Sequence, residues 1–175
     1  MATVVKRIEP HRRLGLSSTP SMQIAQASGL AAVKGAPIYI DSSGNIASTL
    51  TSGGATGYAV TTVASGALIA GFLQEDTASD TTKPKISFTP SLPGMMFKGQ
   101  LVESTTGSLH VLAQTDVGSS GGLIRFSGDT HFGVNTTPGS SQACVMITEL
   151  LDDIGTTGGM VGFVVRASFR QLDLG

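Results

Sequence analysis

The chain contains few of the residues that bind metals, stack on nucleic-acid bases or carry charge. Its 175 residues include one cysteine, three histidines, two tyrosines and no tryptophan, and 13% of them are charged, whereas about 25% are charged in ordinary globular chains. The single Cys144 cannot form an intramolecular disulfide, and no apolar run approaches the roughly 20 residues that cross a bilayer. The start of the chain does not resemble a signal peptide. We therefore expect no disulfide, no membrane span and no secretion by the general route.

The sequence also lacks the spacing of catalytic and metal-binding motifs. No His-Glu-x-x-His or comparable arrangement links the three histidines. The carboxylate pairs Glu75-Asp76 and Asp152-Asp153 are residue types that serve proton transfer and calcium binding. Adjacent carboxylates in a strand point to opposite faces, however, which favours solvated turn charges. We expect no enzyme activity, no cofactor and no metal site.

Serine, threonine and glycine are abundant, and the charge is unevenly distributed. Forty residues are serine or threonine and 23 are glycine, so we expect a surface of hydroxyl-rich loops, part of it buried against other chains. Residues 1–13 hold four basic side chains and one acidic side chain, a net charge of +3, which leaves seven basic and eleven acidic side chains in residues 14–175, a net charge of −4. A net acidic body with few aromatic residues is a poor partner for nucleic acid.

Beyond about residue 30, short apolar runs alternate with turn clusters, at the spacing expected of an all-β sandwich or barrel. The turns contain Gly, Asn, Asp, Ser and Pro, which accept positive φ or pre-set a bend. The sequence predicts strands at 36–41, 57–63, 67–74, 84–89, 95–103, 108–114, 122–127, 131–135, 142–150 and 159–170.

Residues 1–29 differ from the rest, and we predict an extended N-terminal arm there, followed by a β-rich domain over residues 30–175. From Pro10 to Gly29 the sequence has no sustained period of either kind, and small polar residues dominate. Such an arm must bind something to be ordered. The best helical candidate runs from Ser21 to Val33, although Gly29 weakens it.

The stretch from Ala70 to Val102 is the most informative part of the sequence. Apolar, β-compatible residues end at Glu75-Asp76, and a polar turn rich in Ser, Thr and Asp follows. Residues 85–89 then alternate polar and apolar side chains as a half-buried strand does, until Pro90 and Pro93-Gly94 break the pattern. The sequence thus predicts a strand, an acidic turn, a strand, a proline turn and a further strand.

This order of features resembles the capsid decoration, or cement, proteins of tailed bacteriophages, in the broad group similar to the lambda head-stabilising protein. Similar proteins carry an apolar strand with an acidic end, here Gly71 to Asp76, and a Pro-Gly-x-x-Phe segment, here Pro93 to Phe97. The end of the chain also resembles their closing β pair, with Ala143 to Thr148 followed by the acidic turn Asp152 to Gly155 and the predicted strand Gly159 to Phe169. The resemblance covers most of residues 30–172.

The resemblance implies an all-β, barrel-like or β-tulip body with an extended N-terminal arm, on the outer surface of a virion. The expected function is structural: a homo-oligomer, expected to be a trimer, binds the major capsid protein and stabilises contacts between its subunits. The arm would add a strand to a sheet edge of the shell. The predicted capsid-binding residues are the apolar anchors Val4, Ile8 and Leu14 and the basic residues Lys6, Arg7, Arg12 and Arg13.

An alternative function and an alternative interpretation of the N-terminal arm both remain open. A receptor- or glycan-binding β module of a viral spike or tail is the alternative function, although such modules usually present aromatic platforms and only 5% of this chain is aromatic. The alternative interpretation of the arm is a disordered terminus whose basic residues occur by chance, because chain termini are usually loose.

Overall fold

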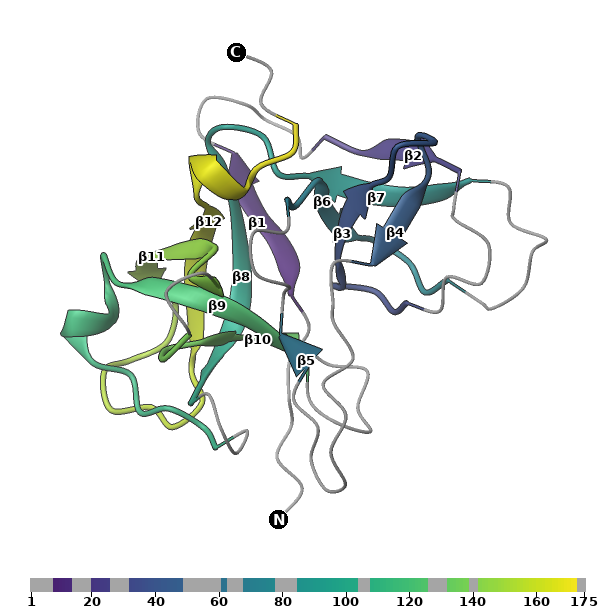
Figure 1. Ribbon diagram of the computed structural model, residues 1–175. Coiled ribbons are helices and arrows are strands. Elements are labelled where there is room, and N and C mark those ends of the chain that lie inside the picture. The colour runs from purple at the N-terminus through teal and green to yellow at the C-terminus, as the bar shows by residue number, and fades with distance from the viewer. Residues whose placement is uncertain are drawn as a thin grey trace.

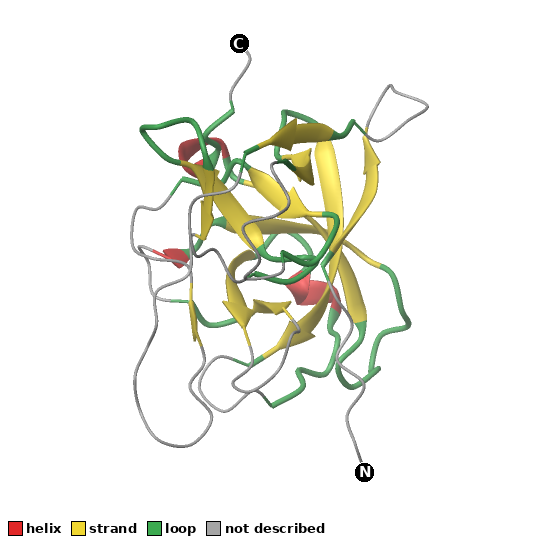
Figure 2. Ribbon diagram, turned by 90° about the vertical axis from the view of Figure 1, so that its right-hand side faces the viewer, coloured by secondary structure: helices red, strands yellow, loops and turns green. Residues whose placement is uncertain are grey.

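Strands are the main regular secondary structure of the described chain. The computed structural model describes residues 8–13, 20–25, 32–48, 61–62, 68–77, 85–103, 108–125, 132–138 and 142–172. Within these ranges there is no α-helix, and no helix is long and apolar enough to cross a membrane. Figure 2 shows that helical turns are limited to short segments. The elements are β1 (Glu9–Arg13), β2 (Met22–Ile24), β3 (Pro37–Ile40), β4 (Ile46–Ser48), β5 (Thr61–Thr62), β6 (Gly71–Leu73), β7 (Ile86–Pro90), β8 (Met95–Val102), the 3-10 helix η1 (Gln114–Asp116), β9 (Ser120–Arg125), β10 (Phe132–Asn135), β11 (Val145–Leu150), β12 (Met160–Val165) and the 3-10 helix η3 (Ala167–Phe169).

The strands form two sheets (Figure 1). The larger sheet has the order β1-β8-β10-β9-β11-β12, with β5 paired to β9, and it closes because β12 also pairs with β8. Strands β8, β10, β9, β11 and β12 thereby form a closed five-stranded barrel, in which only the β8–β10 pair is parallel. The second sheet is antiparallel, with the order β2-β7-β6-β3-β4. The predicted all-β, barrel-like fold is confirmed.

The longest strand, β8, organises the larger sheet. Of its eight residues, the four from Phe97 to Gln100 pair with β12 along one edge. The other edge is shared, because β1 pairs with the first four residues of β8 and β10 pairs with its last three. Strand β8 therefore pairs with three strands of the larger sheet: the N-terminal strand β1, the parallel strand β10 and the C-terminal strand β12.

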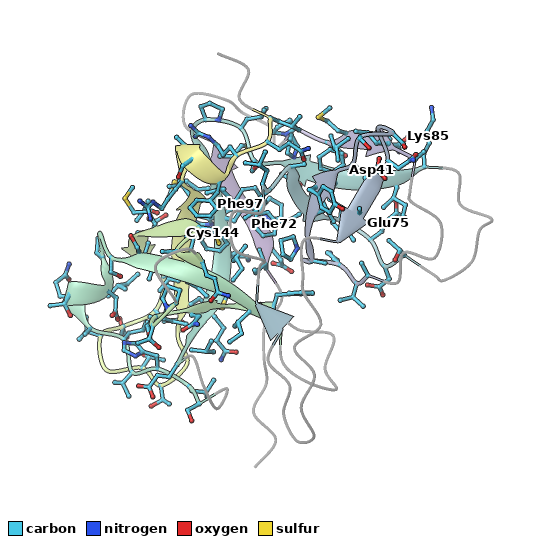
Figure 3. The ribbon with its side chains drawn as sticks, viewed as in Figure 1. Asp41, Phe72, Glu75, Lys85, Phe97 and Cys144 are labelled. Atoms are coloured by element: carbon cyan, nitrogen blue, oxygen red, sulfur yellow. The ribbon has the colours of Figure 1, made fainter. Side chains whose placement is uncertain are left out.

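An aromatic cluster joins the two sheets. The ring of Phe72, from β6 in the second sheet, lies 4.4 Å from the ring of Phe97 in β8 and 6.0 Å from that of Phe163 in β12, centroid to centroid. All three side chains are at most 1% exposed, and Figure 3 shows Phe72 and Phe97 side by side where the sheets meet. Such offset and edge-to-face contacts stabilise beyond the burial of area alone. Buried residues of both sheets belong to one continuous core, so the described chain folds around a single interior.

The described residues of the stretch from Ala70 to Val102 fold as its pattern predicts. Strand β6 ends at Leu73, before the acidic pair, and β7 begins at Ile86, whereas residues 78–84 of the predicted polar turn lie outside the described residues. The Pro93-Gly94 turn then leads into β8, with Gly94 at a φ of 77°, which favours glycine. The chain crosses from the second sheet into the barrel at this turn, so the three predicted strands connect both sheets.

Several sequence predictions differ from the structure. Residues Met22–Ile24 form a strand rather than the start of a helix, because they pair with β7. Residues 108–114 do not form a strand and contain only isolated bridges at Leu109 and Val111. Strands β1, β2 and β4 were not predicted, since they are short and lack an alternating apolar pattern. Of the predicted strand 57–63, only Thr61–Thr62 lie within the described residues.

Truncation of the central ring is expected to destabilise the protein strongly. Because Phe72 is 1% exposed and contacts two other rings, Phe72→Ala should lower the free energy of unfolding by about 3 to 5 kcal/mol. Urea denaturation followed by circular dichroism measures this change, with Leu68→Ala as the control because Leu68 is 44% exposed. Equal effects of the two substitutions would contradict the role of the cluster.

Candidate interaction surface

The candidate surface is centred on β1, the first described strand. Strand β1 lies at one end of the larger sheet and pairs antiparallel with β8, with Glu9 opposite Lys98 and Arg13 opposite Met95. Its described neighbours leave the other edge without a strand partner. The residue that precedes β1, Ile8, therefore lies beside the middle of β8, next to Gly99.

Ile8 lies in the core and is not available to anchor a partner. Its side chain is 1% exposed, and a Cβ added to Gly99 would lie 3.3 Å from Ile8 Cγ1, 3.3 Å from Phe163 and 3.3 Å from Val134. The absence of a side chain at Gly99 thus lets Ile8 pack directly on β8. Ile8, which the sequence predicts as an apolar capsid anchor, is therefore buried within this chain, where its packing contributes to the stability of the body.

The described part of the predicted arm belongs to the body. Residues 9–13 and 22–24 are strands of the two sheets, so the boundary predicted at residue 29 does not separate a free arm from a folded domain there. The sequence missed this pairing because no alternation of apolar residues marks it. Arg12 and Arg13 lie in β1 by their backbone, whereas Val4, Lys6, Arg7 and Leu14 lie outside the described residues.

The free edge of β1 is poorly suited to pair with a further strand. Pro10 has no N–H to donate, and the register shifts between Pro10 and Arg12, which marks a bulge. Glu9 adds a charge to this edge. Proline, bulges and charged side chains are features by which edge strands of natural proteins avoid pairing with other chains. A depression of about 430 Å³ lies at β1, lined by Ile8, Glu9, Pro10, Lys34, Leu73 and Gln74.

Two side-chain contacts fix β1 on the barrel. Lys98 Nζ in β8 lies 3.0 Å from Glu9 Oε2, and His11 Nε2 lies 3.3 Å from Glu149 Oε1 in β11. The Glu9–Lys98 pair is partly exposed, with side chains 41% and 36% accessible, so we expect it to contribute about 0.2 to 1 kcal/mol. Neither Lys98 nor Glu149 was singled out in the sequence, since only the three-dimensional pairing brings them to β1.

The two acidic pairs accept main-chain hydrogen bonds. The N–H of Ser87 donates to Glu75 Oε1 at 2.9 Å, and the N–H of Lys34 donates to Asp76 Oδ1 at 2.7 Å. In the second pair, the N–H of Met160 donates to Asp152 Oδ2 at 2.8 Å. These carboxylates therefore have a structural role in turns, which the prediction of solvated turn charges did not include.

His110 lies between two carboxylates at the end of the barrel where β8 ends. Its Nε2 is 3.2 Å from each carboxylate oxygen of Asp116, and its Nδ1 is 3.6 Å from Glu103 Oε1. Asp116 also accepts the N–H of Ala113 at 2.8 Å. Within the described ranges, no group of three or more His, Cys, Asp or Glu side chains has the arrangement of a metal site.

Cys144 is buried before β11. Burial raises the pKa of the Cys144 thiol to about 11, and backbone hydrogen bonding at Leu123 and Cys144 and the charge of Arg166 only partly oppose this effect. A thiol in this state is protonated at neutral pH and is a poor nucleophile. The residue is therefore part of the core.

Replacement of Ile8 distinguishes a core residue from a docking anchor. Because Ile8 is buried in the isolated chain, Ile8→Ala should lower the free energy of unfolding by about 2 to 5 kcal/mol. Chemical denaturation of the free protein measures this loss, with the more exposed Met22→Ala as control. An unchanged free energy of unfolding would restore Ile8 as a candidate anchor.

The thiol of Cys144 is expected to resist alkylation in the folded protein. At about pH 8 the buried group remains protonated, so iodoacetamide should label it only after denaturation. Mass spectrometry of samples with and without denaturant measures the labelled fraction. Equally fast labelling in both samples would show that the thiol is accessible in the native state.

The chain has no match among the known proteins with which it was compared. Protein-family models, curated proteins and solved structures all give none. The resemblance to decoration proteins therefore stays a prediction from the residue pattern, and a function has to be inferred from the residues and their geometry.

Proposed function

We propose that the protein is a structural capsid decoration, or cement, protein, which binds the outer face of a viral shell and stabilises contacts between major capsid subunits. The observation that carries the proposal is the anchorage of β1. Ile8 is buried and β1 is paired with β8, so the C-terminal end of the basic segment 1–7 is joined to the body at a defined position. The resemblance of residues 70–102 to decoration proteins adds support, since that stretch forms β6, β7 and β8.

The chemistry of the N-terminal segment suits an acidic partner surface. Residues 1–13 carry a net charge of +3 on a chain whose remainder has a net charge of −4. In this proposal Lys6 and Arg7, with Arg12 and Arg13 of β1, face carboxylates of the shell, and Val4 and Leu14 supply apolar contacts. Ile8 no longer belongs to this set.

Single contacts of this kind are weak. Each exposed ion pair contributes about 0.2 to 1 kcal/mol, so one N-terminal segment would dissociate readily from the shell. In a homo-oligomer, which we propose to be a trimer, the second and third segments bind at high effective concentration. Such linkage raises the overall affinity by about 10² to 10⁴ without new types of contact. Shell subunits held by one oligomer are thereby held to one another.

Anchorage of β1 also reduces the entropic cost of docking. Residues 8–13 are already ordered in the body, so the complex does not need to fix their backbone. Ordering one residue costs about 1 to 2 kcal/mol of free energy. A short segment on a rigid strand therefore retains more of its contact energy than a free arm of the same composition.

Co-sedimentation with undecorated capsids of the cognate virus tests the proposal. Wild-type protein should bind saturably, whereas a protein lacking residues 1–7 and the Lys6→Glu/Arg7→Glu variant should each bind at least about tenfold more weakly, because the attraction is lost or reversed. The matched control is Lys85→Glu, which changes an exposed charge before β7 in the second sheet. Removal of residues 1–20 would be a poor test, because it also removes the buried Ile8 and β1.

Each outcome of this experiment has a separate meaning. Equal binding by the wild type and both N-terminal variants would move the footprint to the β body and contradict the role of residues 1–7. No binding by any form would contradict the cement function and favour a receptor- or glycan-binding module.

A further inference from the structure

The residues after β12 extend from the barrel to the second sheet. The chain turns through η3 and then runs beside Ile69, which lies two residues before β6; Figure 1 shows these residues in yellow. The N–H of Ile69 donates to the carbonyl of Phe169 at 2.6 Å, and the N–H of Gln171 donates to the carbonyl of Ile69 at 3.0 Å. The two bonds form a parallel bridge, so the C-terminal residues pair with the segment that enters the second sheet.

The side chain of Gln171 acts as a strand partner for β3. Strand β3 pairs with β6 at Pro37 and Ile38, and at Ile40 the side-chain amide of Gln171 makes the hydrogen bonds instead. The N–H of Ile40 donates to Gln171 Oε1 at 2.6 Å, and Gln171 Nε2 donates to the carbonyl of Ile40 at 2.5 Å. A primary amide offers a donor and an acceptor side by side, whereas a carboxylate has no donor for the carbonyl.

Other contacts fix the receiving residues in place. The carbonyl of Ile69, which is 0% exposed, also accepts the hydroxyl of Ser91 at 2.6 Å. On the side away from Gln171, Ile40 is opposite Ile46 of β4. We call the main-chain groups of Ile40 and Ile69 that face the C-terminal residues the Ile40–Ile69 slot. The slot is thus built by the second sheet and by the segment that connects β7 to β8.

The C-terminal residues themselves are held more loosely. None of the residues from 166 to 172, all of which are described, is buried, and residues 166–168 are exposed. Phe169 and Leu172 pack against the core with only part of their surface. A segment with few buried apolar contacts opens at a lower free energy than the core. Hydrogen bonds to the slot therefore supply much of what holds this segment.

We propose that the Ile40–Ile69 slot is a recognition site for an extended peptide segment with a glutamine side chain, and that residues 167–172 are a detachable strap that fills it. Main-chain bonds to Ile69 add the segment to the sheet, and Ile40 selects the glutamine amide, which is how sheet edges recognise peptides. The strap belongs to the same chain, so it competes at high effective concentration with a like segment of another chain. The slot opens to such a segment when the strap detaches.

Hydrogen exchange of the full chain at neutral pH tests this site. In Gln171→Glu a carboxylate oxygen faces the Ile40 carbonyl, so the amides of Ile40 and Ile69 should exchange about tenfold faster or more than in the wild type. Excess capped heptapeptide with the sequence of residues 166–172 should then slow both amides again. The same peptide with glutamate in place of its glutamine should not protect them.

Matched variants separate this effect from general destabilisation. Gln171→Met removes the amide without adding a charge and should give the same pattern. Gln114→Glu makes the first substitution at an exposed residue of η1 and should leave both amides protected. Amides of β9 and β10 should exchange equally in all variants, because the barrel stays folded.

Two results would overturn the proposal. Unchanged exchange of Ile40 and Ile69 in both Gln171 variants would show that the strap does not fill the slot. Failure of the glutamine peptide to protect the opened slot, or equal protection by both peptides, would show that the slot does not recognise a glutamine segment.

This site goes beyond the proposed function and does not depend on it. The exchange experiment uses no capsid, so its failure would leave docking through residues 1–7 untouched. Loss of capsid binding in the N-terminal charge variants would likewise leave peptide recognition by the slot unchanged.

Discussion

The packing of Phe72 against Phe97 and Phe163 holds the two sheets together. Strand β6 has three residues, and the second sheet contains no strand longer than five, so that sheet has little interior of its own. By placing the Phe72 ring 4.4 Å from Phe97, it shares the core of the closed barrel. Short strands are marginal in isolation and become stable when one face is packed. The Pro93-Gly94 turn, which connects β7 to β8, brings these rings together.

The same core determines what the N-terminal residues can do. Because Ile8 fills the space left by Gly99, and because β8 has an unpaired edge before β10 begins to pair with it, the N-terminal strand completes the larger sheet. A segment that looks like a free arm in the sequence is therefore divided by the structure. Residues 8–13 belong to the body, and residues 1–7 carry Val4, Lys6 and Arg7, which we propose to contact a shell together with Arg12, Arg13 and Leu14. Anchorage is thus assigned to Ile8 and to the backbone pairing of β1, and docking to side chains on either side of Ile8.

The sequence allowed the fold class and the order of β6, β7 and β8 to be predicted, because Glu75-Asp76, Pro90 and Pro93-Gly94 are strong local signals. It did not allow prediction of β1 or β2, whose residues have no apolar alternation and become strands only because β8 and β7 offer them partners. Tertiary pairing overrode the weak helical pattern at Met22–Ile24. The contact of Gln171 with Ile40 had no local signal either, since the two residues lie 131 positions apart in the sequence.

We propose that this protein strengthens a viral shell through its anchored N-terminal segment. The most direct test of this proposal is the temperature at which genome-filled, undecorated capsids of the cognate virus rupture, measured by release of DNA to a fluorescent dye. We expect wild-type protein to raise this temperature in proportion to occupancy, and the Lys6→Glu/Arg7→Glu variant to leave it unchanged. An unchanged rupture temperature at full occupancy by the wild-type protein would contradict the account.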